Sequence, residues 1–278
     1  MKNRRSFLKQ GLLALSALGF HQSIFSFPYK SRVNQKGLKL RFALASDGHY
    51  GQPGTDSDKQ YLDIITWLNK EHADKALDFV LFNGDLVHDR PDLLNHIKIT
   101  YFEKLHFPFF AIPGNHDHAT ETLWEQIFGY SYNHAFEKSD VGFILANTSN
   151  EKGEYLCPDA KFLKDKLDVF SEKKAVFIVL HIPPVKWLKQ DTFFADCPDI
   201  MKLISGYSNV KALFHGHDHS LDGVRYSGKI PHFFDAHFGS NWGTEYKGYR
   251  IVEVYDDNSI KTYQVNASSS PVLNSTKL

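Results

Sequence analysis

The chain has 278 residues, 42% of them hydrophobic, and it is rich in Phe and Tyr. This composition can build a sizeable packed core and excludes disorder for most of the chain. The 32 basic and 32 acidic residues balance, which argues against a protein that binds nucleic acid through bulk charge.

The N-terminal segment predicts an export signal. Arg4-Arg5-Ser6-Phe7-Leu8-Lys9 precedes a short apolar run at residues 11–20, which is typical of a signal peptide and shorter than the roughly 20 residues of a membrane span. The arginine pair resembles a twin-arginine signal, read by the twin-arginine export machinery. We therefore assign residues 1–30 to a signal peptide and leader, with cleavage between residues 20 and 30. The alternative is an uncleaved amphipathic helix.

This signal predicts a periplasmic or otherwise exported protein with no membrane span in its mature form. The leader carries basic residues and no acid, so the mature chain would have a net charge of about −4. The two cysteines, Cys157 and Cys197, are too few for a disulfide framework or a Cys-rich zinc site. A single disulfide and two buried free thiols both remain open, because sequence does not give their geometry.

From residue 38 onward, the pattern predicts one domain at 38–266. Apolar runs predict strands at 40–45, 79–82, 109–112, 141–146, 175–180, 211–214, 232–236 and 249–254, several of them continuous, as in strands buried on both faces. Helical spacing predicts helices at 58–75 and 158–170. The alternation indicates α/β layering. Residues 267–278, which begin with a Ser-rich stretch, are expected to be a disordered tail.

Residues of metal-ligating type follow five of these runs at their carboxyl ends, where open α/β sheets build their sites. The segments are Asp47-Gly48-His49, Asn83-Gly84-Asp85, Gly114-Asn115-His116-Asp117, His181-Ile182-Pro183-Pro184 and Gly216-His217-Asp218-His219. Each alone reads as an ordinary turn, but a packed core does not require five. Carboxylate, amide and imidazole ligands suit Mn, Fe or Zn. The neighbouring glycines allow the backbone to approach an ion closely.

In this order, the motifs D-x-H, G-D, G-N-H-D, H-x-P-P and G-H-x-H resemble those of the calcineurin-like metallophosphoesterases, over residues 38–254. The resemblance implies an α/β (α+β) fold, a four-layer α/β/β/α sandwich of two mixed sheets flanked by helices. It also implies two divalent or trivalent metal ions and the hydrolysis of phosphate esters.

The resemblance assigns a role to each matching residue. The first metal would be bound by Asp47, His49 and His219, the second by Asn115, His181 and His217, and Asp85 would bridge the two. Two cations about 3.5–4 Å apart would activate a bridging hydroxide as the nucleophile. His116 would assist the leaving group, and Asp117 would orient His116.

Other residues keep two readings. His88 stands where purple acid phosphatases carry a Tyr, which argues against an Fe(III)–tyrosinate centre; it either touches substrate or faces solvent. His215, at the end of a buried strand, is read as structural. His118 and His237 are near enough in sequence to line the site. Trp187 and the loop at 239–246 are either substrate-facing or ordinary turns.

The predicted function is hydrolysis of phosphodiesters or phosphomonoesters, of small nucleotides or similar small molecules, without nucleic-acid substrates. The alternative is a catalytically silent metal-binding or scaffold protein on the same fold. Such a protein would be expected to have lost ligands or His116, and this chain retains all of them.

Overall fold

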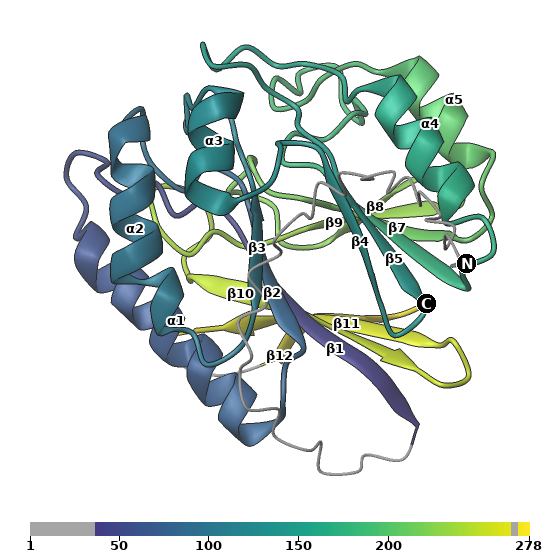
Figure 1. The fold of residues 1–278 in the computed structure, drawn as a ribbon, viewed down its shortest axis with the longest axis horizontal. Coiled ribbons are helices and arrows are strands. Elements are labelled where there is room, and N and C mark those ends of the chain that lie inside the picture. Colours follow the sequence, from purple (N-terminus) through teal and green to yellow (C-terminus); the bar gives the residue numbers. More distant parts are fainter. Residues whose placement is uncertain (1–36, 268–271) are drawn as a thin grey trace, which may run out of the picture.

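The structure, a computed structural model, describes residues 37–267 and 272–278. Two six-stranded sheets pack face to face, with helices on their outer faces (Figure 1). Both sheets contain parallel and antiparallel pairs. The predicted fold, two mixed sheets flanked by helices, is therefore confirmed.

The first sheet has the order β12-β11-β10-β1-β2-β3. Its strands are β1 (Leu38–Ala45), β2 (Phe79–Asn83), β3 (Phe109–Ile112), β10 (Gly248–Tyr255), β11 (Ile260–Asn266) and β12 (Val272–Lys277). Three α-helices pack against it, α1 (Ser57–Asp74), α2 (Leu94–Thr100) and α3 (Glu121–Phe128), together with the 3₁₀ turns η1 (Pro91–Leu93) and η2 (Phe102–Lys104). Tyr61 of α1 and Trp124 of α3 are fully buried in this layer, so the helices are held by their apolar faces.

The second sheet has the order β4-β5-β6-β7-β9-β8. Its strands are β4 (His134–Lys138), β5 (Val141–Leu145), β6 (Ala175–Val179), β7 (Val210–His215), β8 (Val224–Ser227) and β9 (Ile230–Phe234). The helices α4 (Ala160–Val169) and α5 (Pro198–Ser205) cover it. Between the sheets, Phe42 of β1 contacts Phe143 and Phe177 of the second sheet, with ring centroids 5.1 and 5.6 Å apart. Each buried Phe contributes about 1.5–3 kcal/mol.

Side-chain caps explain where the two predicted helices begin. Asp56 accepts a hydrogen bond from the amide of Lys59 at the start of α1, and Asp159 accepts one from the amide of Phe162 at the start of α4. Each cap satisfies an amide that has no partner within its helix. The helices start within two residues of the predicted positions, 58 and 158.

The C-terminal segment corrects the prediction of a disordered tail, which is wrong for residues 272–277. These residues form β12 and pair antiparallel with β11, with Val265 opposite Val272 and Lys261 opposite Lys277. The free edge of β11 offers the backbone groups that order this segment, and no local sequence pattern shows such an edge. The predicted signal peptide, at residues 1–30, and residues 268–271 lie outside the described residues.

The two cysteines form a disulfide, Cys157–Cys197, with Cα atoms 5.7 Å apart. It joins the segment after β5 to the N-terminus of α5. Of the two alternatives that the sequence leaves open, the structure selects the disulfide. Within residues 37–267 and 272–278, no helix is both long enough and apolar enough to cross a bilayer.

Candidate metal centre

The predicted ligands lie in loops at the carboxyl ends of strands in both sheets. The loops after β1, β2 and β3 come from the first sheet, and those after β6 and β7 come from the second. All seven predicted ligands are buried: Asp47, His49, Asp85, Asn115, His181, His217 and His219. Buried charged and polar groups are stable only with partners or ligands.

Backbone hydrogen bonds hold these loops together. The amides of Asp47 and His49 donate to the carbonyls of Gly84 and Asp85, at 3.0 and 2.9 Å. The amide of His217 donates to the carboxylate of Asp47 at 3.0 Å, which links the two sheets. The ligand positions are thus fixed by the fold before any ion binds.

The backbone is strained at four of the candidate metal-ligating residues. Asp47, His49, Asp85 and His217 have φ of 60°, 44°, 51° and 70°, in the left-handed region that non-glycine residues seldom adopt. Such conformations cost on the order of 1 kcal/mol or more each and gather at functional sites. Their concentration in the predicted motifs indicates that these turns are shaped for ligand geometry and not for ease of folding.

Two glycines explain how the loops come so close. A Cβ at Gly84, where φ is +81°, would lie 2.4 Å from Nδ1 of His181, and a Cβ at Gly114 would lie 2.2 Å from Oδ1 of Asp85. Neither contact is possible for a larger residue without movement of a ligand.

The donor atoms form two adjacent groups. In the first, His219 Nε2 lies 3.2 Å from Asp47 Oδ1 and 3.1 Å from His49 Nε2. The second consists of Asp85, His181 and His217, and in each group all donor atoms lie within 4.8 Å of one another. Asp85 Oδ2 lies 3.4 Å from His49 Nε2 and 3.2 Å from His181 Nε2. Asp85 therefore lies between the groups.

Unpartnered polar atoms test whether metal ions fit here. Within the described part of the chain, Asn115 Oδ1, His181 Nε2 and His217 Nε2 are buried without a hydrogen-bond partner. Although His181 Nε2 lies near Asp85, the pair lacks hydrogen-bond geometry. Buried orphaned groups cost roughly 1–3 kcal/mol each, and a cation would satisfy all three. The oxygen and nitrogen donors suit Mn, Fe or Zn.

The electrostatics of the metal-free site favour cation binding. Burial would raise the pKa of both Asp47 and Asp85, but the imidazoles of His219 and His181 hold these pKa values below the usual range. Burial lowers the pKa of His49 and His217 to about 3. The carboxylates of Asp47 and Asp85 are thus ionised. The imidazoles of His49 and His217 are neutral with a free lone pair, which is the form that binds metals.

His181 differs from the other two imidazoles. Burial alone would lower its pKa, but Asp85, assisted by Asp47, raises the pKa to about 9. Cation binding at this nitrogen is therefore coupled to the release of a proton.

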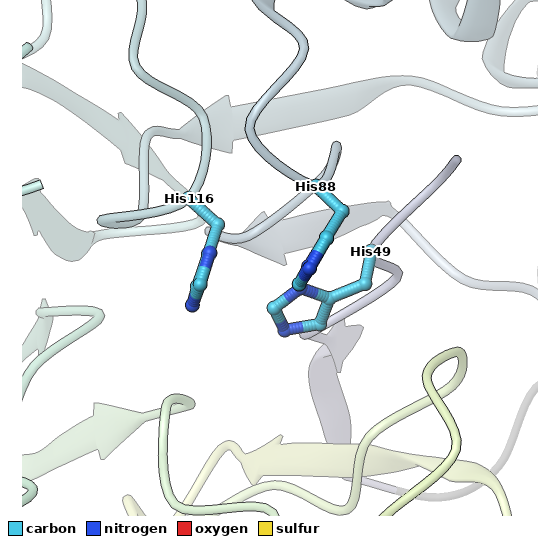
Figure 2. Close-up of side chains that lie close together, drawn as sticks. All are labelled: His49, His88 and His116. Carbon is cyan, nitrogen blue, oxygen red and sulfur yellow. The ribbon is translucent and has the colours of Figure 1, made fainter. Parts of the chain in front are cut away.

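His88 lies in the site, beside two of the predicted site residues. Figure 2 shows His49, His88 and His116 projecting from separate loops into one space. His88 Nδ1 lies 2.9 Å from His49 Nδ1, and its ring stacks on that of His116 at 4.8 Å between centroids. His88 therefore faces the site, and its contact with substrate remains a prediction.

The acid beside His116 is Asp89 and not Asp117, which corrects the expected contact. His116 Nδ1 lies 2.7 Å from Asp89 Oδ1, and His118 Nε2 lies 3.1 Å from the same oxygen. Asp117 instead accepts from the backbone amides of Val87 and Gly114, at 2.9 and 2.7 Å. The chain turns after His116 so that its neighbour in sequence points into the loop. Asp89 was not predicted, although it follows His88 within the second motif.

Three further histidines differ in how they relate to the site. His215 is fully buried and pairs with His232 at 2.8 Å, which confirms its structural reading. His237 stacks on the candidate ligand His219, with ring centroids 5.0 Å apart, so it packs against the site. His118 reaches the site through Asp89.

The loop at 239–246 packs on the site, whereas Trp187 packs elsewhere. Trp242 stacks on His219 with ring centroids 4.0 Å apart. Trp187 contacts His232, and its indole nitrogen donates to the carbonyl of Tyr226. Two residues that sequence reasoning missed, Tyr155 and Phe193, also contact a ligand imidazole, that of His217. Both lie in loops without a motif, so no sequence signal marks them.

Comparison with known proteins agrees with this geometry. A model of the calcineurin-like phosphoesterase family matches residues 40–221, which is most of the chain. The chain belongs to this family. It is a phosphoric ester hydrolase, and it carries clusters of Asp and His residues that could hold metal ions.

Curated relatives share this family and are named as phosphodiesterases. The chain is 27% identical over 240 residues to a 3′,5′-cyclic-nucleotide phosphodiesterase of Nostoc, covering 79% of this chain and 86% of the relative. It is 22% identical over 228 residues to a 3′,5′-cyclic adenosine monophosphate phosphodiesterase of Haemophilus influenzae, covering 75% and 81%.

Solved structures of similar fold include a dimetal phosphatase from Danio rerio, with a TM-score of 0.68 and 12% identity, covering 86% of this chain and 98% of that chain. A purple acid phosphatase from yellow lupin has a TM-score of 0.64 and 13% identity, covering 86% and 53%. At this identity the likeness supports the fold alone.

Proposed function

We propose that this protein is a dinuclear metal-dependent phosphodiesterase that acts on small nucleotides. The proposed ligands are Asp47, His49 and His219 for one metal and Asn115, His181 and His217 for the other, with Asp85 as the bridge. The observation that carries the proposal is the pair of buried donor groups on either side of Asp85, with three orphaned donor atoms that a bound cation would satisfy. The proposed metals are Mn, Fe or Zn.

The substrate class is supported by the relatives. Both are named as phosphodiesterases of cyclic nucleotides, and they are matched over most of their length. We therefore favour a phosphodiester over a phosphomonoester.

The side chains of this chain supply binding and proton transfer. When bound, the cations lower the pKa of water to about 7 and neutralise charge on the phosphate. Asp89 holds His116 through Nδ1, which leaves Nε2 free to donate a proton to the leaving oxygen. His88, stacked on His116, restricts rotation of that ring.

The test uses the purified mature protein, stripped of metal and reconstituted separately with Mn²⁺, Fe²⁺ or Zn²⁺. We expect about two metal ions per chain by elemental analysis. We also expect faster hydrolysis of 3′,5′-cyclic AMP and bis-p-nitrophenyl phosphate than of the monoester p-nitrophenyl phosphate. Failure to retain metal, or activity toward the monoester only, would contradict the proposal.

We also propose export through the twin-arginine route, to the periplasm or another exported location. The arginine pair at residues 4 and 5 motivates this. The disulfide between Cys157 and Cys197 supports it, because disulfides persist chiefly in oxidising compartments.

A further inference from the structure

Three aromatic side chains lie beside the metal-ligating imidazoles and remain partly open to solvent. Tyr155, Phe193 and Trp242 are 39%, 40% and 40% exposed. Most other large aromatic side chains of the described chain are buried. Aromatic rings that remain partly exposed beside a site keep apolar surface in water, which is typical of a ligand-binding surface.

The three rings form one continuous surface with two ligands, which we call the aromatic ledge. The Tyr155 and Phe193 rings stand nearly perpendicular to the His217 ring, with centroids 4.8 and 5.5 Å from it. Phe193 lies 5.9 Å from Trp242 at an interplanar angle of 25°, and Trp242 lies flat on His219 at 4.0 Å. The ledge thus begins at the proposed metal ligands and extends outward.

Each ring stands on a loop that the fold fixes. The segment of Tyr155 is bonded to the chain just after β5 through the amide of Leu156 and the carbonyl of Thr148, at 2.8 Å. The segment of Phe193 is bonded to the H-x-P-P motif through the amide of Ala195 and the carbonyl of Pro183, at 2.9 Å. Rings held in this way lose little freedom on binding a ligand.

The disulfide and the third loop complete this framework. Cys157 and Cys197 follow Tyr155 and Phe193 closely in sequence and join their two segments. The loop of Trp242 is anchored on the ligand segment itself, where the amide of Thr244 donates to the carbonyl of His219 at 2.8 Å. The ledge is therefore built in advance of substrate.

We propose that the aromatic ledge of Tyr155, Phe193 and Trp242 binds the base of the nucleotide substrate by stacking. The inference rests on the proposed function, because the ledge adjoins the place where the phosphate is bound. A ligand on the ledge contacts rings that themselves contact His217 and His219. The part of the substrate that reaches it is therefore joined to the phosphate by a short link and is flat and apolar on its faces. A nucleobase joined through ribose fits this description.

Stacking on the ledge would also govern which bases the enzyme accepts. Base–aromatic stacking contributes about 1–3 kcal/mol per base and tolerates different bases, since every base has a π-face. The ledge therefore detects that a base is present, and it does not require one particular base. Adenine and guanine substrates are expected to be used at similar rates, ahead of pyrimidines, because a purine offers the larger face.

The test compares two cyclic diesters with the metal-loaded enzyme. One is 3′,5′-cyclic AMP, and the other is the methyl riboside 3′,5′-cyclic phosphate, which has the same phosphate and sugar without a base. We expect the wild-type enzyme to prefer the nucleotide by roughly 5- to 150-fold in kcat/KM, through a lower KM. In Phe193→Leu and Trp242→Leu this ratio should fall toward one, and Phe193→Tyr should restore it.

Controls separate stacking from a structural role. Metal content is measured for every variant, because Phe193 and Trp242 also contact ligand imidazoles. Tyr226→Leu removes an exposed tyrosine of β8 outside the ledge and should keep the wild-type ratio. If the variants lose metal and lose both activities in parallel, the ledge only supports the ligands and the proposal is overturned.

Two further outcomes distinguish the ledge from the proposed function. Equal kcat/KM of the wild-type enzyme for both diesters overturns the ledge and leaves the phosphodiesterase intact. Hydrolysis of neither, in a metal-loaded enzyme, contradicts the substrate class and the ledge together.

Discussion

His116 has two acidic neighbours, one in space and one in sequence, and the two carboxylates make different contacts. Asp89 pairs with its Nδ1, and Asp117 binds two backbone amides of the surrounding loops. Burial, together with the nearby Asp85, raises the pKa of Asp117 to about 7. These contacts make Asp89 a positioning residue for His116 and make Asp117 part of the loop framework.

His116→Ala should retain both metals and slow the hydrolysis of 3′,5′-cyclic AMP by about 10²–10⁴-fold, because its alkoxide leaving group needs a proton. The loss should be smaller for bis-p-nitrophenyl phosphate, whose p-nitrophenolate leaves without one. His217→Ala is the contrast and should lose metal. Elemental analysis and kcat for the two substrates measure both effects. Equal metal loss in the two variants would show that His116 is a ligand.

Asp89→Asn and Asp117→Asn should separate an effect on the orientation of His116 from an effect on folding stability. The first should lower kcat for the poor leaving group, with metal content and stability unchanged, and should shift the pH profile of kcat, since the partner of His116 loses its charge. The second should lower the free energy of unfolding by about 1–3 kcal/mol, because Asn has a single acceptor oxygen and one of the two buried amides loses its partner. Thermal unfolding and pH–rate profiles are the measurements. A pH profile shifted by Asp117→Asn and not by Asp89→Asn would restore the assignment made from sequence.

At the scale of elements, β1, β10 and α1 meet at an ion-pair cluster. Glu253 of β10 lies 3.1 Å from Arg41 Nε of β1 and 2.5 Å from Lys75 Nζ at the end of α1. Arg41 also binds Glu71 of α1. Burial would raise the pKa of Glu253, but the bonds from Lys75, Tyr255 and Arg41 lower it to about 2.

A carboxylate whose folded pKa is below its unfolded value stabilises the protein at higher pH and loses this effect as pH falls. The contribution of Glu253 should therefore disappear between about pH 4.5 and pH 2. Glu253→Gln should be less stable at neutral pH and should lose less stability across this acidic range. Urea unfolding at pH 7, 4 and 3 measures the difference. Parallel pH curves for the two proteins would mean that the cluster does not act through this charge.

The disulfide links segments 40 residues apart in sequence. Cys157→Ser combined with Cys197→Ser should lower the free energy of unfolding by about 2–4 kcal/mol, since the unfolded chain regains freedom. It should also raise KM for 3′,5′-cyclic AMP more than for the base-free diester, because the segments of Tyr155 and Phe193 are no longer joined. Urea unfolding and the two KM values test this. A stability loss with no change in the ratio of KM values would limit the disulfide to a structural role.

At the scale of the whole molecule, export should depend on the arginine pair. Arg4→Lys with Arg5→Lys should retain the protein in the cytoplasm, because the pair is recognised by a receptor and its charge alone is not sufficient. Cell fractionation measures the outcome, with Lys9→Arg as a variant of equal charge that keeps the pair. An unchanged periplasmic yield in the double variant would exclude the twin-arginine route.

The framework of both sheets was readable from sequence because strands buried between layers must be apolar. Each strand predicted from an apolar run is present. The α-helices and strands that were not predicted interleave polar residues with apolar ones, and they are β4, β8, β11, β12, α2, α3 and α5. A short amphipathic segment obtains its order from the neighbour it pairs with, so its own residues carry little signal.

The sequence by itself determined the ligand types and the strands that carry them, because metal chemistry requires Asp, Asn and His and the sheet places them after buried strands. The tertiary structure alone decided that Asp89 and not Asp117 meets His116, that His88 enters the site, that the cysteines pair, and that Tyr155, Phe193 and Trp242 surround the ligands. These are contacts between side chains of separate loops. Their geometry depends on how the two sheets pack, which no local pattern of residues encodes.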